Sequence, residues 1–259
     1  MQSLKHYLRA AYRHLPGAAR LDEFAASGCT GILQKIVCRH LPASVRQWRF
    51  VQCSYSQCAE DLLVLHALDY LKKTEVGYYV DVGAYDPVQY SNTLRLHQRG
   101  WRGINIDAMP QNLAPFHTAR PEDINLNLAV GPNTGTAEFL SYQSGTTGRL
   151  RDSAGSDLKS ILGEELKEVI QVSTAPLSKI LKEHHPKAVP FGFLSVDCEG
   201  AELEVLRSND WAMFRPWVIA VEDHAVAHRS ELDSFCELNR YKLFSIAFIT
   251  KIFVDADLC

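Results

Sequence analysis

Acidic side chains follow three apolar segments of this 259-residue chain, where they could hold a charged ligand. Asp81 and Gly83 end the first segment, Asp107 ends the second, and Asp197 ends a third much further along. Glycine permits a tight turn and a close backbone approach. A carboxylate at Asp107 could accept both hydroxyls of a ribose, or it could cap the helix expected after it. We therefore expect a site for a cofactor that contains a nucleoside.

Two carboxyls and a histidine are candidates for moving a proton. Glu222 and His224 close another apolar segment, and Asp197 would share their edge of a sheet. Imidazole ordinarily gains and loses its proton near physiological pH, so His224 is the first candidate for a general base, followed by Asp197 and Glu222. A purely structural role for His224 is about equally plausible. Asp197, Glu199 and Glu222 could instead hold a divalent cation, which the sequence permits but does not require.

The turn after the first apolar segment differs from a dinucleotide-binding turn. Gly83 is not followed by second and third glycines at the G-x-G-x-x-G spacing. An edge crowded with acids would also repel a pyrophosphate, which disfavours a nicotinamide-dependent oxidoreductase. Asn127 and Ala129 end a further apolar segment, where they would either read an adenine ring or serve as ordinary strand residues.

The elements that must position these residues alternate along the chain. Strands are predicted at 78–82, 101–106, 124–130, 137–142, 169–173, 191–196 and 217–222, with a closing antiparallel hairpin at 241–247 and 250–254. Helices are predicted at 57–72 (with Ser56 as N-cap), 91–99, 111–119, 157–167, 177–183 and 201–208, and a loop that could act as a lid at 144–155. This alternation predicts a three-layer α/β sandwich with a mostly parallel sheet, whose carboxyl-terminal edge carries the acids.

The first 52 residues differ in pattern from the rest. Leu4 and Leu8 keep a helical spacing, with Lys5 and Arg9 interleaved. We expect a helical extension at 1–52 that packs on the domain, joins copies in a homo-oligomer, or lies on a membrane surface. The α/β domain is expected at 53–259.

Composition limits the classes of function. A formal net charge of −3 does not suit a dedicated nucleic-acid binder. The sequence contains no apolar stretch of the ~20 residues that a membrane span needs, and its start lacks the apolar core of a secretion signal. Its seven cysteines include no C-x-x-C pair, which favours free thiols. We expect a cytoplasmic location, either free or against the inner face of the membrane.

Several stretches together resemble the FkbM family of S-adenosylmethionine-dependent methyltransferases. They are residues 55–61 (YSQCAED), 79–87 (YVDVGAYDP), 91–93 (SNT), 100–107 (GWRGINID), 120–127 (RPEDINLN) and 195–202 (SVDCEGAE). The resemblance spans roughly 55–253 and excludes the first 50 residues. It implies the Rossmann-like class I methyltransferase fold, with a seven-stranded sheet over 53–259, and S-adenosylmethionine as cofactor, with S-adenosylhomocysteine as product.

The resemblance also implies roles for individual residues. Asp81, Gly83 and Ala84 would line the amino acid end of the cofactor, and Asp107 its ribose. The full set expected to bind the cofactor is Asp81, Gly83, Ala84, Tyr85, Ser91, Asn92, Asp107, Ala108, Asn127, Ala129 and Asp197. Tyr85 and Asp86 depart from the family, which often has Asn or His there.

The expected reaction is transfer of a methyl group to a hydroxyl of a sugar-like acceptor, such as a glycan, a polysaccharide or a glycosylated metabolite. The alternatives are an N-methyltransferase, an enzyme that uses a metal to acidify the hydroxyl, and a methyltransferase-like module that binds a partner without catalysis. Chelator sensitivity would separate the metal version. The intact set of Asp81, Gly83, Asp107 and Asp197 argues against the inactive module.

Overall fold

The computed structural model describes residues 52–142, 148–151, 165–225 and 228–259. Residues from Ser54 onward belong to one compact unit. The helical extension expected at 1–52 lies outside the described residues, apart from Gln52. Within the described residues, no helix is long and apolar enough to cross a membrane.

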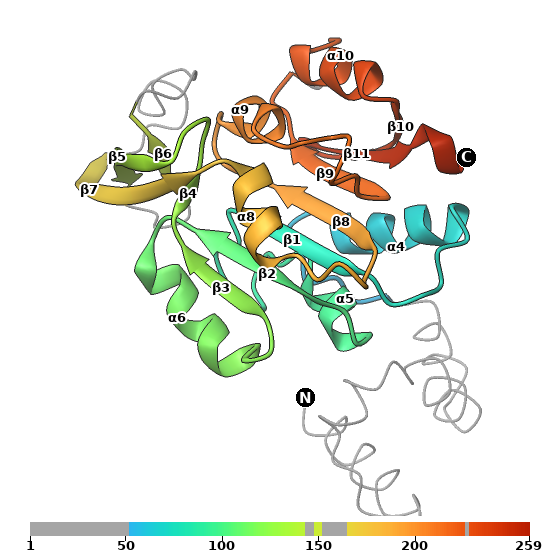
Figure 1. The fold of residues 1–259 in the computed structure, drawn as a ribbon, viewed down its shortest axis with the longest axis horizontal. Helices are drawn as coiled ribbons and strands as arrows, with labels where there is room; N and C mark the ends of the chain where they lie inside the picture. The colour runs from blue at the N-terminus through green and yellow to red at the C-terminus, as the bar shows by residue number, and fades with distance from the viewer. Residues whose placement is uncertain (1–51, 143–147, 152–164, 226–227) are drawn as a thin grey trace, which may run out of the picture. The chain divides into compact units, whose positions relative to one another are not determined.

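A seven-stranded sheet forms the centre of the domain (Figure 1). Its strands, in spatial order, are β10 (Tyr241–Ala247), β11 (Thr250–Asp255), β9 (Val218–Glu222), β8 (Phe191–Val196), β1 (Tyr78–Val82), β2 (Arg102–Asp107) and β3 (Ile124–Asn127). The five strands from β9 to β3 are parallel, whereas β11 runs antiparallel to β9 and to β10. The predicted parallel sheet with a closing antiparallel hairpin is confirmed.

Helices cover both faces of this sheet, as the three-layer prediction requires (Figure 1). They are α4 (Glu60–Tyr70), α5 (Leu94–Gln98), α6 (Pro110–Ala119), α8 (Leu177–His184), α9 (Glu202–Arg207) and α10 (Glu231–Leu238), followed by a short 3-10 helix at Ala256–Leu258. Side chains of a strand point alternately to the two faces. In β1, Tyr78, Val80 and Val82 therefore pack with α8, α9 and α10, whereas Tyr79 packs with α4 and α5.

Helix boundaries differ from the prediction at two places. Helix α4 begins at Glu60 and its N-cap position is Ala59, so the prediction of Ser56 as N-cap is wrong. The Ser56 hydroxyl instead exchanges hydrogen bonds with Asp61, donating to its carboxylate and accepting from its backbone amide. Helix α5 begins only at Leu94, because the residues before it form a turn.

A second, four-stranded sheet lies beside the first (Figure 1). Its strands, in spatial order, are β4 (Ala129–Val130), β7 (Leu166–Ala175), β5 (Gly135–Tyr142) and β6 (Gly148–Leu150). The strand predicted at 124–130 is thus two strands in different sheets. Part of the predicted loop at 144–155 is strand β6. The helix predicted at 157–167 falls mostly outside the described residues, and its last two residues lie in β7.

Candidate active site

A cavity of about 460 Å³ opens at the carboxyl-terminal edge of the main sheet, where the second sheet forms part of its wall. Strand order reverses here, because β2 and β3 lie on one side of β1 and β8 and β9 on the other. Open α/β sheets bind ligands at such a switch point. The predicted site residues that line the cavity are Gly83, Tyr85, Asp107, Ala108, Ala129, Asp197, Glu199, Glu222 and His224.

Gly83 allows β1 and β8 to end in close contact. Its φ is +81°, and a β-carbon there would lie 1.7 Å from the carbonyl oxygen of Asp197. The Gly83 amide donates to the Ile106 carbonyl at 2.9 Å, and the Asp197 amide donates to the Val82 carbonyl at 3.0 Å. These bonds join the ends of three neighbouring strands into the floor of the cavity. At the turn after β1 only glycine fits, because a side chain would collide with the neighbouring backbone.

Asp107 is held in a fixed orientation at the end of β2. One carboxylate oxygen accepts from the Tyr85 amide at 3.0 Å, and the other from the Met109 amide at 2.8 Å and from Asn112 at 3.2 Å. Burial raises the pKa of Asp107, and these hydrogen bonds partly offset the rise. A carboxylate offers about four acceptor positions, so Asp107 can accept a further bond from a ligand hydroxyl.

Asp81 does not line the cavity. It is the fourth residue of β1, so it shares the face of Tyr79 and points toward α5. There its carboxylate accepts a hydrogen bond from the Thr93 hydroxyl at 2.7 Å. Burial raises its pKa. The structure therefore places Asp81 behind the floor of the cavity, away from the position expected for the amino acid end of a cofactor.

Four other residues expected to touch a cofactor also do not line the cavity: Ala84, Ser91, Asn92 and Asn127. Ala84 packs against Leu113 and Phe116. Asn127 lies at the end of β3 and donates to the backbone carbonyls of Asp107 and Ala108, both at 2.9 Å.

Ser91 and Asn92 belong to the turn before α5. The Ser91 hydroxyl accepts from Arg120 at 2.9 Å, and Asn92 donates to the Ser195 hydroxyl at 3.2 Å. Arg120 is almost fully buried and also donates to the Pro87 carbonyl and to the Thr93 hydroxyl. These residues secure the turn that carries the cavity-lining tyrosines.

Asp197 and Glu222 form a coupled acidic pair at the ends of β8 and β9. Carboxylate oxygens of the two side chains lie within 4.8 Å of each other and of a Glu202 oxygen. The Asp197 side chain faces the cavity. Protein atoms crowd around its carboxylate and keep water away from it, and this desolvation raises its pKa. Burial and then the negative charge of Asp197 raise the pKa of Glu222 further. Two carboxyls in contact cannot both ionise easily, so the pair carries one negative charge near neutral pH.

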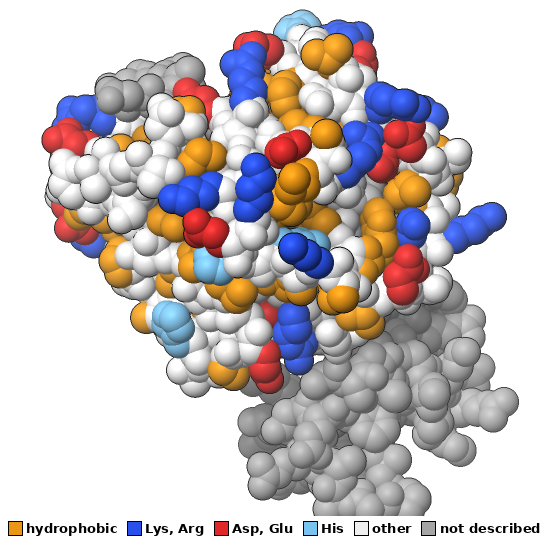
Figure 2. All heavy atoms as spheres, viewed as in Figure 1, with side chains coloured by type: hydrophobic (Ala, Val, Ile, Leu, Met, Phe, Trp, Pro, Cys, Tyr) orange, Lys and Arg blue, Asp and Glu red, His pale blue; other side chains and the backbone are white. Residues whose placement is uncertain are grey.

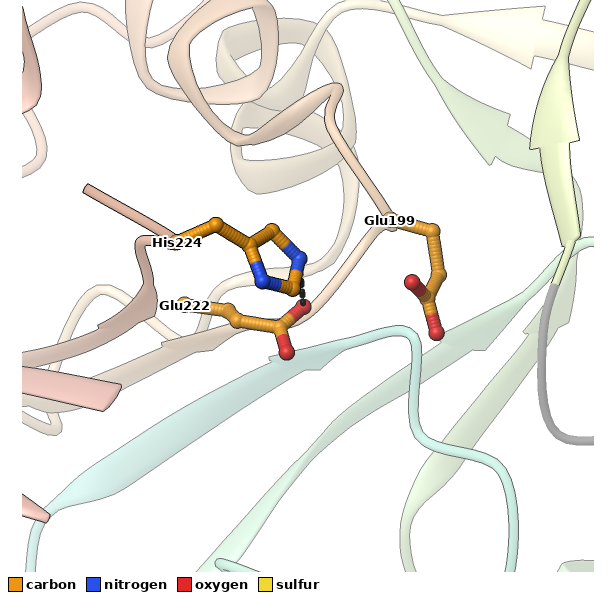
Figure 3. A group of neighbouring side chains, drawn as sticks. All are labelled: Glu199, Glu222 and His224. Atoms are coloured by element: carbon orange, nitrogen blue, oxygen red, sulfur yellow. Dashed lines mark ion pairs between the residues drawn. The ribbon is translucent and has the colours of Figure 1, made fainter. Parts of the chain in front are cut away.

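His224 lies beside this pair at the mouth of the cavity. Figure 3 shows Glu222 and His224 together at the end of β9, with Glu199 facing them from the loop after β8. The His224 Nε2 atom is 3.9 Å from a Glu222 oxygen, and the imidazole is 59% exposed. Ligand atoms of the three side chains lie within 4.8 Å of one another, a spacing that could suit a cation. The cation set named from sequence, Asp197 with Glu199 and Glu222, is not among the groups of side chains this close in the part of the chain that the structure describes.

Several residues that line the cavity were not predicted from the sequence. Tyr90 stacks on Tyr85 with ring centroids 6.3 Å apart, and Phe248 comes from the turn between β10 and β11. Met109 and Leu128 add apolar surface near Asp107. For Phe248 the sequence offered one signal, an aromatic residue in the turn of the predicted hairpin, whereas Tyr90 belongs to no motif and lies eight residues after the end of β1.

The cavity thus has two chemically different ends. One end offers Asp107 with the apolar side chains of Ala108, Met109 and Leu128, which suits a nucleoside. The other end offers Asp197, Glu222 and His224, which suits a positive charge and a group that must lose a proton. Figure 2 shows acidic and basic side chains interspersed over one face of the described part of the molecule.

Comparison with known families agrees with this geometry. A family model described as the methyltransferase FkbM domain matches residues 81–244, which is more than half of the chain. The match runs from the end of β1 into β10 and so includes every cavity-lining carboxylate described above. No curated protein matches the chain.

Proposed function

The chain belongs to the FkbM family of S-adenosylmethionine-dependent methyltransferases, and we propose that it methylates a hydroxyl group of a sugar-like acceptor. The observation that carries the proposal is the end of the cavity beyond Asp197, where two carboxyls and an imidazole converge. Carboxylates accept hydrogen bonds from hydroxyls, and an imidazole can take up the proton that a hydroxyl must release.

The residues of the cavity fit the cofactor of the family. Asp107 would hold the ribose hydroxyls, and Ala108, Met109 and Leu128 would pack against the adenine. The single negative charge of the Asp197–Glu222 pair would face the positive end of the cofactor. When bound, S-adenosylmethionine supplies an electrophilic methyl group on a sulfonium.

His224 is our candidate for the general base. A bound cofactor would supply the methyl group, and a ring nitrogen of His224 would take up the proton that the acceptor hydroxyl releases on methylation. The single negative charge of the Asp197–Glu222 pair, whose nearest Glu222 oxygen is 3.9 Å from Nε2, would stabilise the imidazolium that results. Asp197 is the second candidate, because its raised pKa makes it a stronger base than an ordinary aspartate.

An N-methyltransferase is the nearest alternative. The same acidic end would attract an amine as an ammonium ion, which has no lone pair with which to attack a methyl group. A hydroxyl has no such disadvantage, so the charge of the site favours oxygen as the acceptor atom. A metal-assisted version would use Glu199, Glu222 and His224, and treatment with a chelator would abolish its activity but not that of the metal-free enzyme.

The direct test is an assay with a ¹³C-methyl-labelled cofactor, offered with a panel of methyl glycosides and matched amino sugars. Carbon NMR separates a methyl ether from an N-methyl group by chemical shift. The proposal predicts methyl ethers. N-methyl products alone would contradict it, and cofactor binding without any transfer would favour the inactive binding module.

A further inference from the structure

The turn between β10 and β11 places an exposed aromatic ring at the acidic end of the cavity. Phe248 is 69% exposed and lines the cavity together with Ile249. The register of the sheet pairs Thr250 with Glu222, so this turn lies directly beside the acidic pair. Other apolar side chains of the chain are exposed as well, but Phe248 lines the cavity, where its ring face can pack against a bound ligand.

The turn is fastened to the strand that carries the acids. The Asp223 amide donates to the Ile249 carbonyl at 2.7 Å. Lys251, only 2% exposed, donates to Asp223 at 2.8 Å and to Asp233 at 2.7 Å. These bonds secure both strands beside Phe248, so the ring is presented at a defined place.

The aromatic end lies far from the nucleoside end. Strands β2 and β9, which carry Asp107 and Glu222, are separated by β1 and β8. Three steps of about 4.8 Å each put these strands on the order of 14 Å apart. A cofactor held at Asp107 with its charged end near Asp197 would leave the space beside Glu222, His224 and Phe248 for the acceptor.

We propose that Phe248 is the platform on which a sugar ring of the acceptor lies. This inference rests on the proposed function and specifies the acceptor side of the same cavity. A pyranose has a face of C–H bonds, which packs against an aromatic ring, and hydroxyls around its rim. Glu199, Glu222 and His224 lie where they can bond those hydroxyls, and His224 is beside the one to be methylated.

Saturation-transfer NMR tests this inference without a known acceptor. The protein is saturated with S-adenosylhomocysteine and titrated with methyl glycosides of the common hexoses. We expect transfer to C–H protons of at least one glycoside. Phe248→Ala should reduce the transfer at least fivefold, whereas Phe248→Trp should keep it. Leu238→Ala removes an apolar side chain that is 83% exposed and does not line the cavity, and it should have no effect.

Calorimetric titration of S-adenosylhomocysteine in the same samples separates failure of the Phe248 platform from failure of the proposed function. Normal binding of S-adenosylhomocysteine with no transfer to any glycoside, or with equal transfer in wild type and Phe248→Ala, would overturn the platform alone. Failure of the wild type to bind S-adenosylhomocysteine would overturn the proposed function itself. Thermal unfolding of each variant confirms that the fold is intact.

Discussion

Asp197 and Glu222 stand at the ends of adjacent parallel strands, with carboxylate oxygens within 4.8 Å of each other at the cavity. Two ionised carboxylates at this separation repel each other, so the pair favours a state in which one of them is protonated. Burial and mutual repulsion raise the pKa of both groups. In the absence of cofactor the pair is therefore a source of instability at neutral pH, which a bound positive charge would relieve.

This relationship predicts how stability depends on pH. Because both pKa values are raised in the folded state, the unfolded carboxyls lose their protons first as the pH rises above about 4. The folded state then binds more protons than the unfolded state, so the free energy of unfolding falls with rising pH until the folded pair is ionised. Glu222→Gln should therefore raise Tm at pH 8, on the order of 3 °C, and change it little at pH 4.

Differential scanning calorimetry of the ligand-free protein at several pH values measures this effect. Glu122→Gln is the matched control, since Glu122 is exposed and lies away from the cavity. Equal shifts for the two variants, or a lower Tm for Glu222→Gln at pH 8, would contradict the coupled pair.

Alanine substitutions at Gly83 and Gly100 provide a second matched test, which concerns the close contact between β1 and β8. Both have a positive φ, but a β-carbon on Gly83 would collide with the Asp197 backbone, whereas one on Gly100 has no atom within 4 Å. Gly100→Ala should cost about 1 kcal/mol of stability through its backbone conformation alone. Gly83→Ala should cost at least about 2 kcal/mol more and weaken binding of S-adenosylhomocysteine. Urea unfolding and calorimetry measure the two effects, and equal costs would exclude the close contact between β1 and β8.

Arg120 should act on the cavity through the turn that it holds. Replacing it with methionine leaves the Pro87 carbonyl and the hydroxyls of Ser91 and Thr93 without their donor, at a cost of about 3 kcal/mol. The turn carries Tyr85 and Tyr90, so affinity for S-adenosylhomocysteine should also fall.

Arg99→Met provides the comparison for Arg120, because Arg99 is exposed and outside the cavity. Urea unfolding gives the stability and calorimetry the affinity. Unchanged affinity in a destabilised Arg120→Met protein would confine Arg120 to a structural role.

His224→Ala should slow transfer without weakening cofactor binding. Loss of a general base typically costs a factor of about 10²–10⁴ in rate. Single-turnover assays with an acceptor from the glycoside panel give the rate, and calorimetry gives the affinity. If the variant keeps its rate while Asp197→Asn loses it, the base is Asp197.

The sequence predicted the sheet well because its strands are short apolar runs that end in acids or glycine. The second sheet was missed, since the residues of β5 and β7 alternate weakly and pair with each other rather than with their neighbours in the main sheet. Strands β3 and β4 belong to different sheets although only one residue separates them: β3 ends at Asn127 and β4 starts at Ala129.

Within the site, residues at strand ends were easier to predict than those inside strands or turns. Asp107, Asp197 and Glu222 reach the cavity because each ends or directly follows a parallel strand. Asp81 also comes near a strand end, but it is one residue short, and the alternation of side chains turns it toward Thr93. Phe248 could not be assigned, because its place depends on how the hairpin folds back beside β9.

The central claim is that the cavity binds S-adenosylmethionine through Asp107. Calorimetric titration of S-adenosylmethionine into wild type, Asp107→Ala and the exposed-surface control Asp69→Asn tests it most directly. We expect micromolar-range binding by the wild type and by Asp69→Asn, and at least a hundredfold weaker binding by a folded Asp107→Ala protein. Equal binding by all three proteins, or no binding by the wild type, would contradict it.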